Sequence, residues 1–100
     1  MRVYVSSPTP AFGPQILAYA EYRVFAALAR YAGVRGAQVV LQSEPQGGVR
    51  CSVTIEFHSA PAARARVKGI NAAGAIDRAA GRVADLMRRR FQSEILTASN

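Results

Sequence analysis

The sequence predicts a single α+β domain with the element order β-α-β-β-β-α, in which two helices pack on one face of a four-stranded sheet. In four short segments, apolar residues alternate with polar ones, the pattern of strands with one buried face. Two longer segments repeat their apolar residues every three or four positions, as amphipathic helices do. The 100 residues, half of them hydrophobic, suffice for one two-layer core.

The N-terminal part contains a strand followed by a helix. Residues 1–6 alternate in polarity and form the first predicted strand. Pro14 suits the first position of a helix, because the N–H that proline lacks would have no partner there. Residues 15–31 are predicted to be helical, and Gly33 is the expected stop. The apolar stripe of this helix comprises Leu17, Ala20, Val24, Leu28 and Tyr31.

The middle of the chain predicts three further strands. Residues 37–43 form a buried strand, and residues 44–48, with a proline and two glycines, form a turn. Residues 49–58 alternate most clearly, so these two strands are expected to pair as a hairpin. Residues 63–68 form the fourth strand. Its polar face carries a basic row of Arg64, Arg66 and Lys68.

A second helix ends the domain. Asn71 is a favourable N-cap, because its side chain can accept a hydrogen bond from the first helical turn. The helix is expected to end near Arg90 or Phe91, with residues 1–92 as the domain and residues 93–100 as a flexible tail. Its apolar stripe comprises Ile76, Ala79, Ala80, Val83 and Met87.

The charge of the chain favours a polyanionic partner. The 13 basic residues exceed the 6 acidic ones and give a net charge of +7, with Lys68 as the only lysine. Arginine offers a planar fork of donors that matches phosphate and stacks on bases. A GC-rich coding sequence would also enrich arginine, but it would not explain the excess of positive over negative charge. Charge alone therefore favours binding of RNA or DNA over mere solubility.

Candidate catalytic groups are few, and each has a structural explanation. Cys51 points to the core in its strand, whereas His58 ends that strand at the surface. Because the two positions differ by an odd number, they face opposite sides and form no nucleophile–base pair. Asp77 and Asp85 lie more than two helical turns apart. We therefore predict no enzyme, no metal site, no cofactor and no small-molecule substrate.

Arginines on the two helices form the predicted RNA-binding set. Arg23 and Arg30 are seven positions apart and share a face of the first helix. If the two helices lie side by side, Arg23 and Arg30 are expected to form one positive surface with Arg82 and Arg89 of the second helix. Asp85 is expected to pair with Arg89. The full set is Arg23, Arg30, Arg78, Arg82, Arg88, Arg89 and Arg90, while the row Arg64, Arg66 and Lys68 lies on the opposite sheet face without an assigned role.

The order of elements distinguishes among nucleic-acid modules. An RNA recognition motif needs a different order, and a double-stranded RNA-binding domain needs a lysine cluster that the second helix lacks. With its extra first strand, the chain resembles the ribosome hibernation promoting factor family, also called ribosome-associated inhibitor proteins. The segments that carry the resemblance are Ile16-Leu17-Ala18-Tyr19, Leu28-Ala29-Arg30-Tyr31, Val39-Val40-Leu41, Ala75-Ile76-Asp77-Arg78-Ala79-Ala80-Gly81-Arg82-Val83 and Met87-Arg88-Arg89.

The resemblance implies binding to the small ribosomal subunit near the decoding centre, in the channel of messenger and transfer RNA. The implied role is translation regulation under stress by blocking idle ribosomes, with contacts at Arg82, Arg88 and Arg89 and then at Arg23 and Arg30. Longer family members carry a separate dimerisation domain, which we do not expect here. The chain departs from the family pattern at Asn71, Ala73, Gly81 and Asp85.

A different class of function is the alternative. The open sheet face, or an exposed edge strand, would pair with a protein partner or a second copy of the chain, giving a homodimer without RNA binding. Salt distinguishes the two, because phosphate binding weakens steeply as salt rises. The single cysteine, an N-terminus unlike a secretory signal and the lack of a long apolar segment predict a cytoplasmic location away from membranes.

Overall fold

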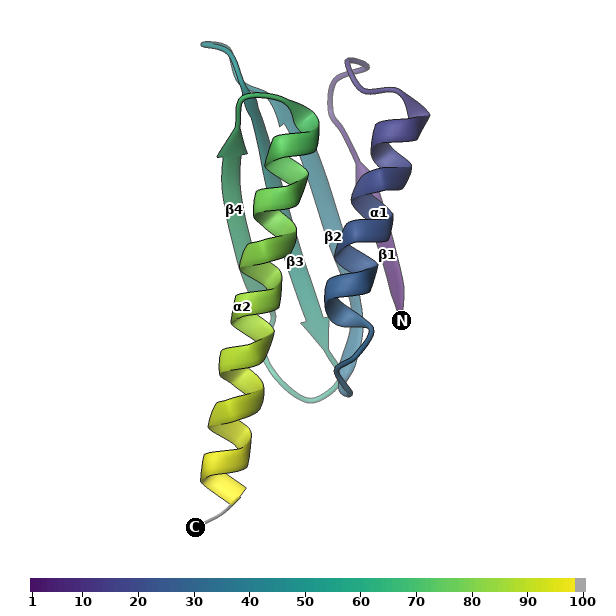
Figure 1. The fold of residues 1–100 in the computed structure, drawn as a ribbon. Helices are drawn as coiled ribbons and strands as arrows, with labels where there is room; N and C mark the ends of the chain where they lie inside the picture. Colours follow the sequence, from purple (N-terminus) through teal and green to yellow (C-terminus); the bar gives the residue numbers. More distant parts are fainter. Residues whose placement is uncertain (99–100) are drawn as a thin grey trace.

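A computed structural model describes residues 1–98 of the chain, and the side chains of residues 1–93. Its elements are β1 (Arg2–Ser6), α1 (Pro14–Leu28), β2 (Val34–Ser43), β3 (Val49–Phe57), β4 (Ala63–Gly69) and α2 (Ala72–Ala98). The four strands form one sheet in the order β1-β2-β3-β4. Figure 1 shows both helices on the same face of this sheet, with α1 over β1 and β2 and α2 over β3 and β4. The predicted α+β topology is confirmed.

The crossover through α1 fixes the directions of the strands. Because α1 carries the chain back along the sheet, β1 and β2 run parallel, as strands joined by a helical crossover do. Short turns join the remaining strands, so β2, β3 and β4 run antiparallel to their neighbours. The turn after β2 uses Gly47 and Gly48 at φ values of 97° and 86°, which glycine adopts readily. β1 and β4 are consequently the two edges of the sheet.

The core lies between the sheet and the helices. Most residues of the predicted stripes are buried, including Val24 and Leu28 on α1 and Ile76 and Val83 on α2, while Leu17 and Tyr31 are partly buried. Many buried helix positions are alanine, whose small side chain lets a helix lie close to the sheet. The inward-facing strand residues that complete this core include Val39, Leu41, Cys51, Val53 and Ile55.

α1 is shorter than the sequence predicted. It ends at Leu28 instead of near Tyr31, and the Tyr31 N–H donates to the Leu28 carbonyl in the turn that follows. Gly33 then adopts a φ of 86°, and β2 begins at once at Val34. The helix must end early because β2 extends further towards the N-terminus than its apolar run indicated. Arg30 therefore lies in a turn.

α2 is longer than predicted. The expected cap is confirmed, because the Gly74 N–H donates to Asn71 Oδ1 at 2.8 Å. The helix continues to Ala98, beyond the end of the sheet (Figure 1), where the sequence predicted an end near Arg90 or Phe91. Residues 91–98 contain neither glycine nor proline, so nothing local stops the helix. The flexibility of residues 93–100 stays a prediction, and residues 99–100 lie outside the described part.

Burial makes the Cys51 thiol a reporter of core opening. The side chain is inaccessible to solvent, and burial raises the pKa of its thiol to about 11. Because the thiolate is the nucleophile, we expect no reaction of the folded protein with an aromatic disulfide reagent at about pH 8. The same reagent should react fully after unfolding in guanidinium, as absorbance measures. Equal rates in both states would contradict a closed core.

Candidate nucleic-acid interface

A groove at the edge between α2 and β4 is lined by four positively charged residues. Arg66 and Lys68 come from β4, and Arg78 and Arg82 come from α2. We call it the α2–β4 groove. It has a volume of about 520 Å³ and is lined by Arg66, Val67, Lys68, Arg78, Gly81, Arg82 and Asp85.

Local structure explains why this groove forms. α2 turns its small and aliphatic residues towards the sheet, so positions 78, 82 and 85, spaced by three and four, fall on one flank. That flank faces β4, whose outer side no further strand covers. Gly81 lies between them with no neighbouring atom within 4 Å of where a Cβ would be. The groove is therefore open, and all four cations are exposed.

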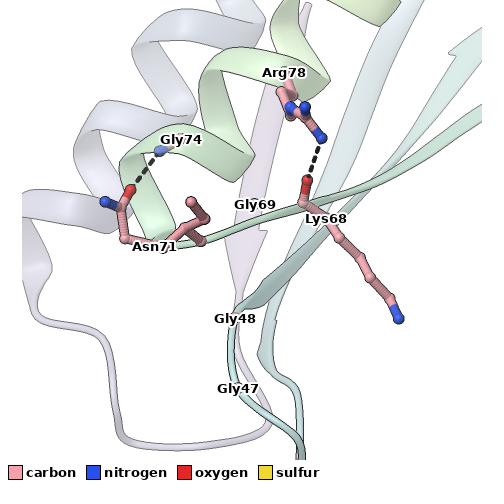
Figure 2. A pocket seen from close by; sticks show the side chains of 8 residues that line it. Gly47, Gly48, Lys68, Gly69, Asn71, Gly74 and Arg78 are labelled. Carbon is pink, nitrogen blue, oxygen red and sulfur yellow. Dashed lines mark hydrogen bonds between the residues drawn. The ribbon is translucent and has the colours of Figure 1, made fainter.

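Arg78 links the groove to a second hollow at the start of α2. Its Nη1 donates to the Lys68 carbonyl at 3.1 Å, which ties the second turn of α2 to the end of β4. Figure 2 shows this bond, the Asn71 cap and the glycines around the hollow. Arg78 and Lys68 line both spaces. The second hollow, of about 600 Å³, is lined by Gly47, Gly48, Lys68, Gly69, Ile70, Asn71, Gly74 and Arg78.

One carboxylate accompanies the cations of the groove. Asp85 Oδ1 lies 2.9 Å from Arg88 Nη2, so Asp85 pairs with Arg88, where the sequence predicted a pair with Arg89. Side chains three or four positions apart are both neighbours on a helix, so periodicity alone does not decide whether Asp85 pairs with Arg88 or with Arg89. Both partners of the pair are about half exposed, so the interaction is weak and screened by salt. Four cations against one paired carboxylate leave the groove positive.

Arg23 of α1 does not merge with Arg82, contrary to the sequence prediction. The helices do lie side by side, but Arg23 meets α2 at Asp77, with 3.2 Å between Nε and Oδ1. Asp77 and Arg82 are five positions apart, about 140° around the helix. Arg89, seven positions after Arg82, shares its flank. The positive surface consequently forms between α2 and β4, and the row that the sequence left without a role supplies Arg66 and Lys68 to it.

Asp77 instead joins the two helices. The Tyr19 hydroxyl donates to Asp77 Oδ1 at 2.5 Å, and Arg23 binds the same oxygen. The hydrogen bond to Asp77 is the main cause that raises the pKa of Tyr19 above its usual value. This cluster occupies Arg23 with a structural contact.

Two further predicted arginines lie against aromatic rings. The guanidinium of Arg90 lies 4.0 Å from the centre of the Phe57 ring, a cation–π contact. Arg30 lies 5.9 Å from the ring centre of Tyr31, in the turn after α1. Tyr31 also packs edge-on against Phe91 at 6.1 Å. These contacts hold the end of α1, the end of β3 and α2 together at the pole opposite the Asn71 cap.

Cys51 and His58 are separated, as the sequence predicted. Cys51 is buried in the core, and His58 is exposed after the end of β3. Among the side chains that the structure describes, no three from histidine, cysteine, aspartate and glutamate gather as a metal site requires. Within the described residues, no helix is both long and apolar enough to cross a membrane.

Comparison with known proteins finds similar solved structures but no matching sequence. No family model and no curated protein matches the chain. The N-terminal domain of Protein Y from Thermus thermophilus superposes with a TM-score of 0.74 at 21% identity, covering 89% of this chain and 98% of that one. A ribosomal subunit interface protein from Coxiella burnetii superposes with a TM-score of 0.80 at 5% identity, covering 92% and 99%.

This chain has their fold. The similarity extends over nearly the whole of both structures, so it includes the sheet and both helices. The fold expected from the family resemblance is therefore confirmed. The α2–β4 groove belongs to the elements that are shared.

Proposed function

We propose that this chain binds RNA of the small ribosomal subunit near the decoding centre, in the channel of messenger and transfer RNA, and so blocks idle ribosomes in the cytoplasm. The observation that carries the proposal is the α2–β4 groove, with four exposed cations, on a fold shared with a protein described as a ribosomal subunit interface protein. Blocking is steric and needs no chemical step.

The two sides of the groove suit a phosphate backbone. Alternate residues of a strand are about 6.6 Å apart, which is the expected spacing from Arg66 to Lys68. Residues four apart on a helix are separated by about 6 Å, the expected spacing from Arg78 to Arg82. The two rows of cations therefore repeat at nearly the same interval, so a phosphate backbone that follows the outer edge of β4 can contact both.

The remaining arginines are expected to contribute less to RNA binding than the residues of the groove. Arg89 continues the flank of Arg82, and exposed Arg88 lies beside it with Asp85 as its partner. The contacts of Arg23 with Asp77, and of Arg30 and Arg90 with aromatic rings, favour structural roles for these three. We therefore place the primary contacts at Arg66, Lys68, Arg78 and Arg82, followed by Arg89.

Sedimentation with isolated small ribosomal subunits tests the proposal. We expect the protein to sediment with the subunits at about 50 mM salt. Four phosphate contacts predict that affinity falls by about 50- to 150-fold when salt rises to about 200 mM. Added protein should also inhibit translation in an extract. Absence of the protein from the subunit fraction at low salt would reject the proposal, and binding that is insensitive to salt would favour a protein-interaction module.

A further inference from the structure

The open face of the sheet has a hollow of its own, away from both helices. It has a volume of about 250 Å³ and is lined by Arg2, Tyr4, Arg35, Gly36, Ala37, Gln38 and Glu56. We call it the Gly36 hollow. None of these residues lines the α2–β4 groove, so the two sites can be tested separately.

Strand register creates the Gly36 hollow. Gly36 of β2 lies between its partners Arg2 of β1 and Glu56 of β3, so the centre of this cross-strand row has no side chain. A Cβ at Gly36 would lie 2.5 Å from the Arg2 carbonyl oxygen, so close strand pairing requires glycine here. A bulge between Val34 and Gly36 interrupts the regular register and brings Arg35 to the rim.

The walls of the hollow carry an aromatic ring and polar hydrogen-bonding groups. Tyr4 is 59% exposed, so its ring is accessible to a ligand. Gln38 Nε2 donates to Glu56 Oε1 at 3.4 Å, so the two side chains lie beside each other. This bond leaves the second carboxylate oxygen of Glu56 and the amide oxygen of Gln38 as acceptors. Arg2 and Arg35 stand beside them.

These groups together match an unpaired nucleobase. An aromatic ring stacks on a base of any kind, and carboxylate and amide oxygens accept hydrogen bonds from exocyclic amino groups. The neighbouring guanidinium groups suit the attached phosphates. An acidic peptide fits less well, because Glu56 would repel it.

The open face also provides a path for the rest of such a strand. The next cross-strand row runs from Tyr4 through Gln38 and Thr54 to Arg64. It spans three strand spacings, about 14 Å, and it ends at an exposed cation that does not line the α2–β4 groove. Of the basic row Arg64, Arg66 and Lys68, only Arg64 does not line the α2–β4 groove.

We propose that the Gly36 hollow binds an amino-bearing base of a single-stranded RNA whose backbone crosses the open sheet face towards Arg64. Tyr4 stacks on the base, Glu56 and Gln38 accept from its amino group, and Arg64 neutralises a phosphate further along. Cytidine, which presents an amino donor, binds more tightly than uridine, which presents a carbonyl at the same place.

Fluorescence anisotropy with labelled hexacytidine and hexauridine RNA at about 0.1 M salt tests this site. We expect at least fivefold tighter binding of hexacytidine. Tyr4→Ala should weaken hexacytidine binding by about tenfold, the scale of one lost base stack. Tyr22→Ala is the matched control, because Tyr22 is 66% exposed on α1, away from the hollow, and its loss should leave affinity unchanged.

A second variant tests the recognition of the amino group. Glu56→Ala should abolish the preference for hexacytidine while the protein stays folded, as circular dichroism checks. Hexacytidine paired with hexaguanosine should lose binding at this site, because its bases are no longer available. Arg82→Gln should leave the cytidine preference intact, which separates this site from the α2–β4 groove. Equal affinities for the two single strands, or equal effects of Tyr4→Ala and Tyr22→Ala, would overturn the proposal.

Discussion

Replacing Arg66, Lys68, Arg78 and Arg82 together by glutamine should lower the affinity for small ribosomal subunits by about 100-fold. All four side chains are exposed at the α2–β4 groove, so their loss removes charge without opening the core. Exposed ion pairs contribute up to about 1 kcal/mol each, and about 2.8 kcal/mol in total corresponds to a 100-fold change. Each lost phosphate contact should also reduce the slope of log affinity against log salt by about 0.9. Sedimentation at several salt concentrations measures both effects.

A charge-matched comparison separates the groove from net charge. Arg66→Gln with Arg82→Gln removes two positive charges from the groove, and Arg23→Gln with Arg30→Gln removes two from residues outside it that make structural contacts. The groove pair should lower subunit binding by about tenfold and the other pair by less than about twofold. Similar losses in both variants would show that binding follows overall charge, and the groove would then have no special role. Thermal melting checks that both variants fold.

Sequence periodicity predicted the elements well because burial follows directly from it. The apolar residues that alternate within residues 49–57 face the core, and so does the apolar stripe from Ile76 to Met87, as expected. Periodicity also showed which residues share a flank of a helix. It did not show which neighbour each flank faces, because that depends on the order of strands in the sheet. Arg82 was therefore expected beside α1 and is found beside β4.

The hollow on the open face could not be predicted from local patterns. Gly36 was expected to precede the second strand, because the apolar run begins at Ala37. Its role depends on register with two other strands, which bring Arg2 to one side and Glu56 to the other. Tyr4 alternates with apolar Val3 and Val5 in the sequence, but this alternation does not give its partners across the sheet. Which residues surround Gly36 depends on contacts between segments that are distant in the sequence.

Gly69→Ala should destabilise the domain at the junction between β4 and α2. A Cβ at Gly69 would lie 2.5 Å from the Ala75 nitrogen and 2.8 Å from its Cα, and backbone atoms cannot give way as a side chain can. Overpacking of this kind costs about 1–3 kcal/mol. For a domain of this size, each kcal/mol lowers the melting temperature by roughly 4–8 °C. Calorimetry or circular dichroism measures this shift.

Gly81→Ala is the matched control, and its effect should have the opposite sign. Gly81 is exposed within α2, and a Cβ there would meet no atom within 4 Å. Because alanine favours a helix interior over glycine by about 1 kcal/mol, this variant should melt at a higher temperature than the unsubstituted chain. If Gly69→Ala were equally stabilising, β4 and α2 would not be in close contact at Gly69. The position of Arg78 beside Lys68, on which the groove depends, would then lose its structural basis, since the bond between them needs that close approach.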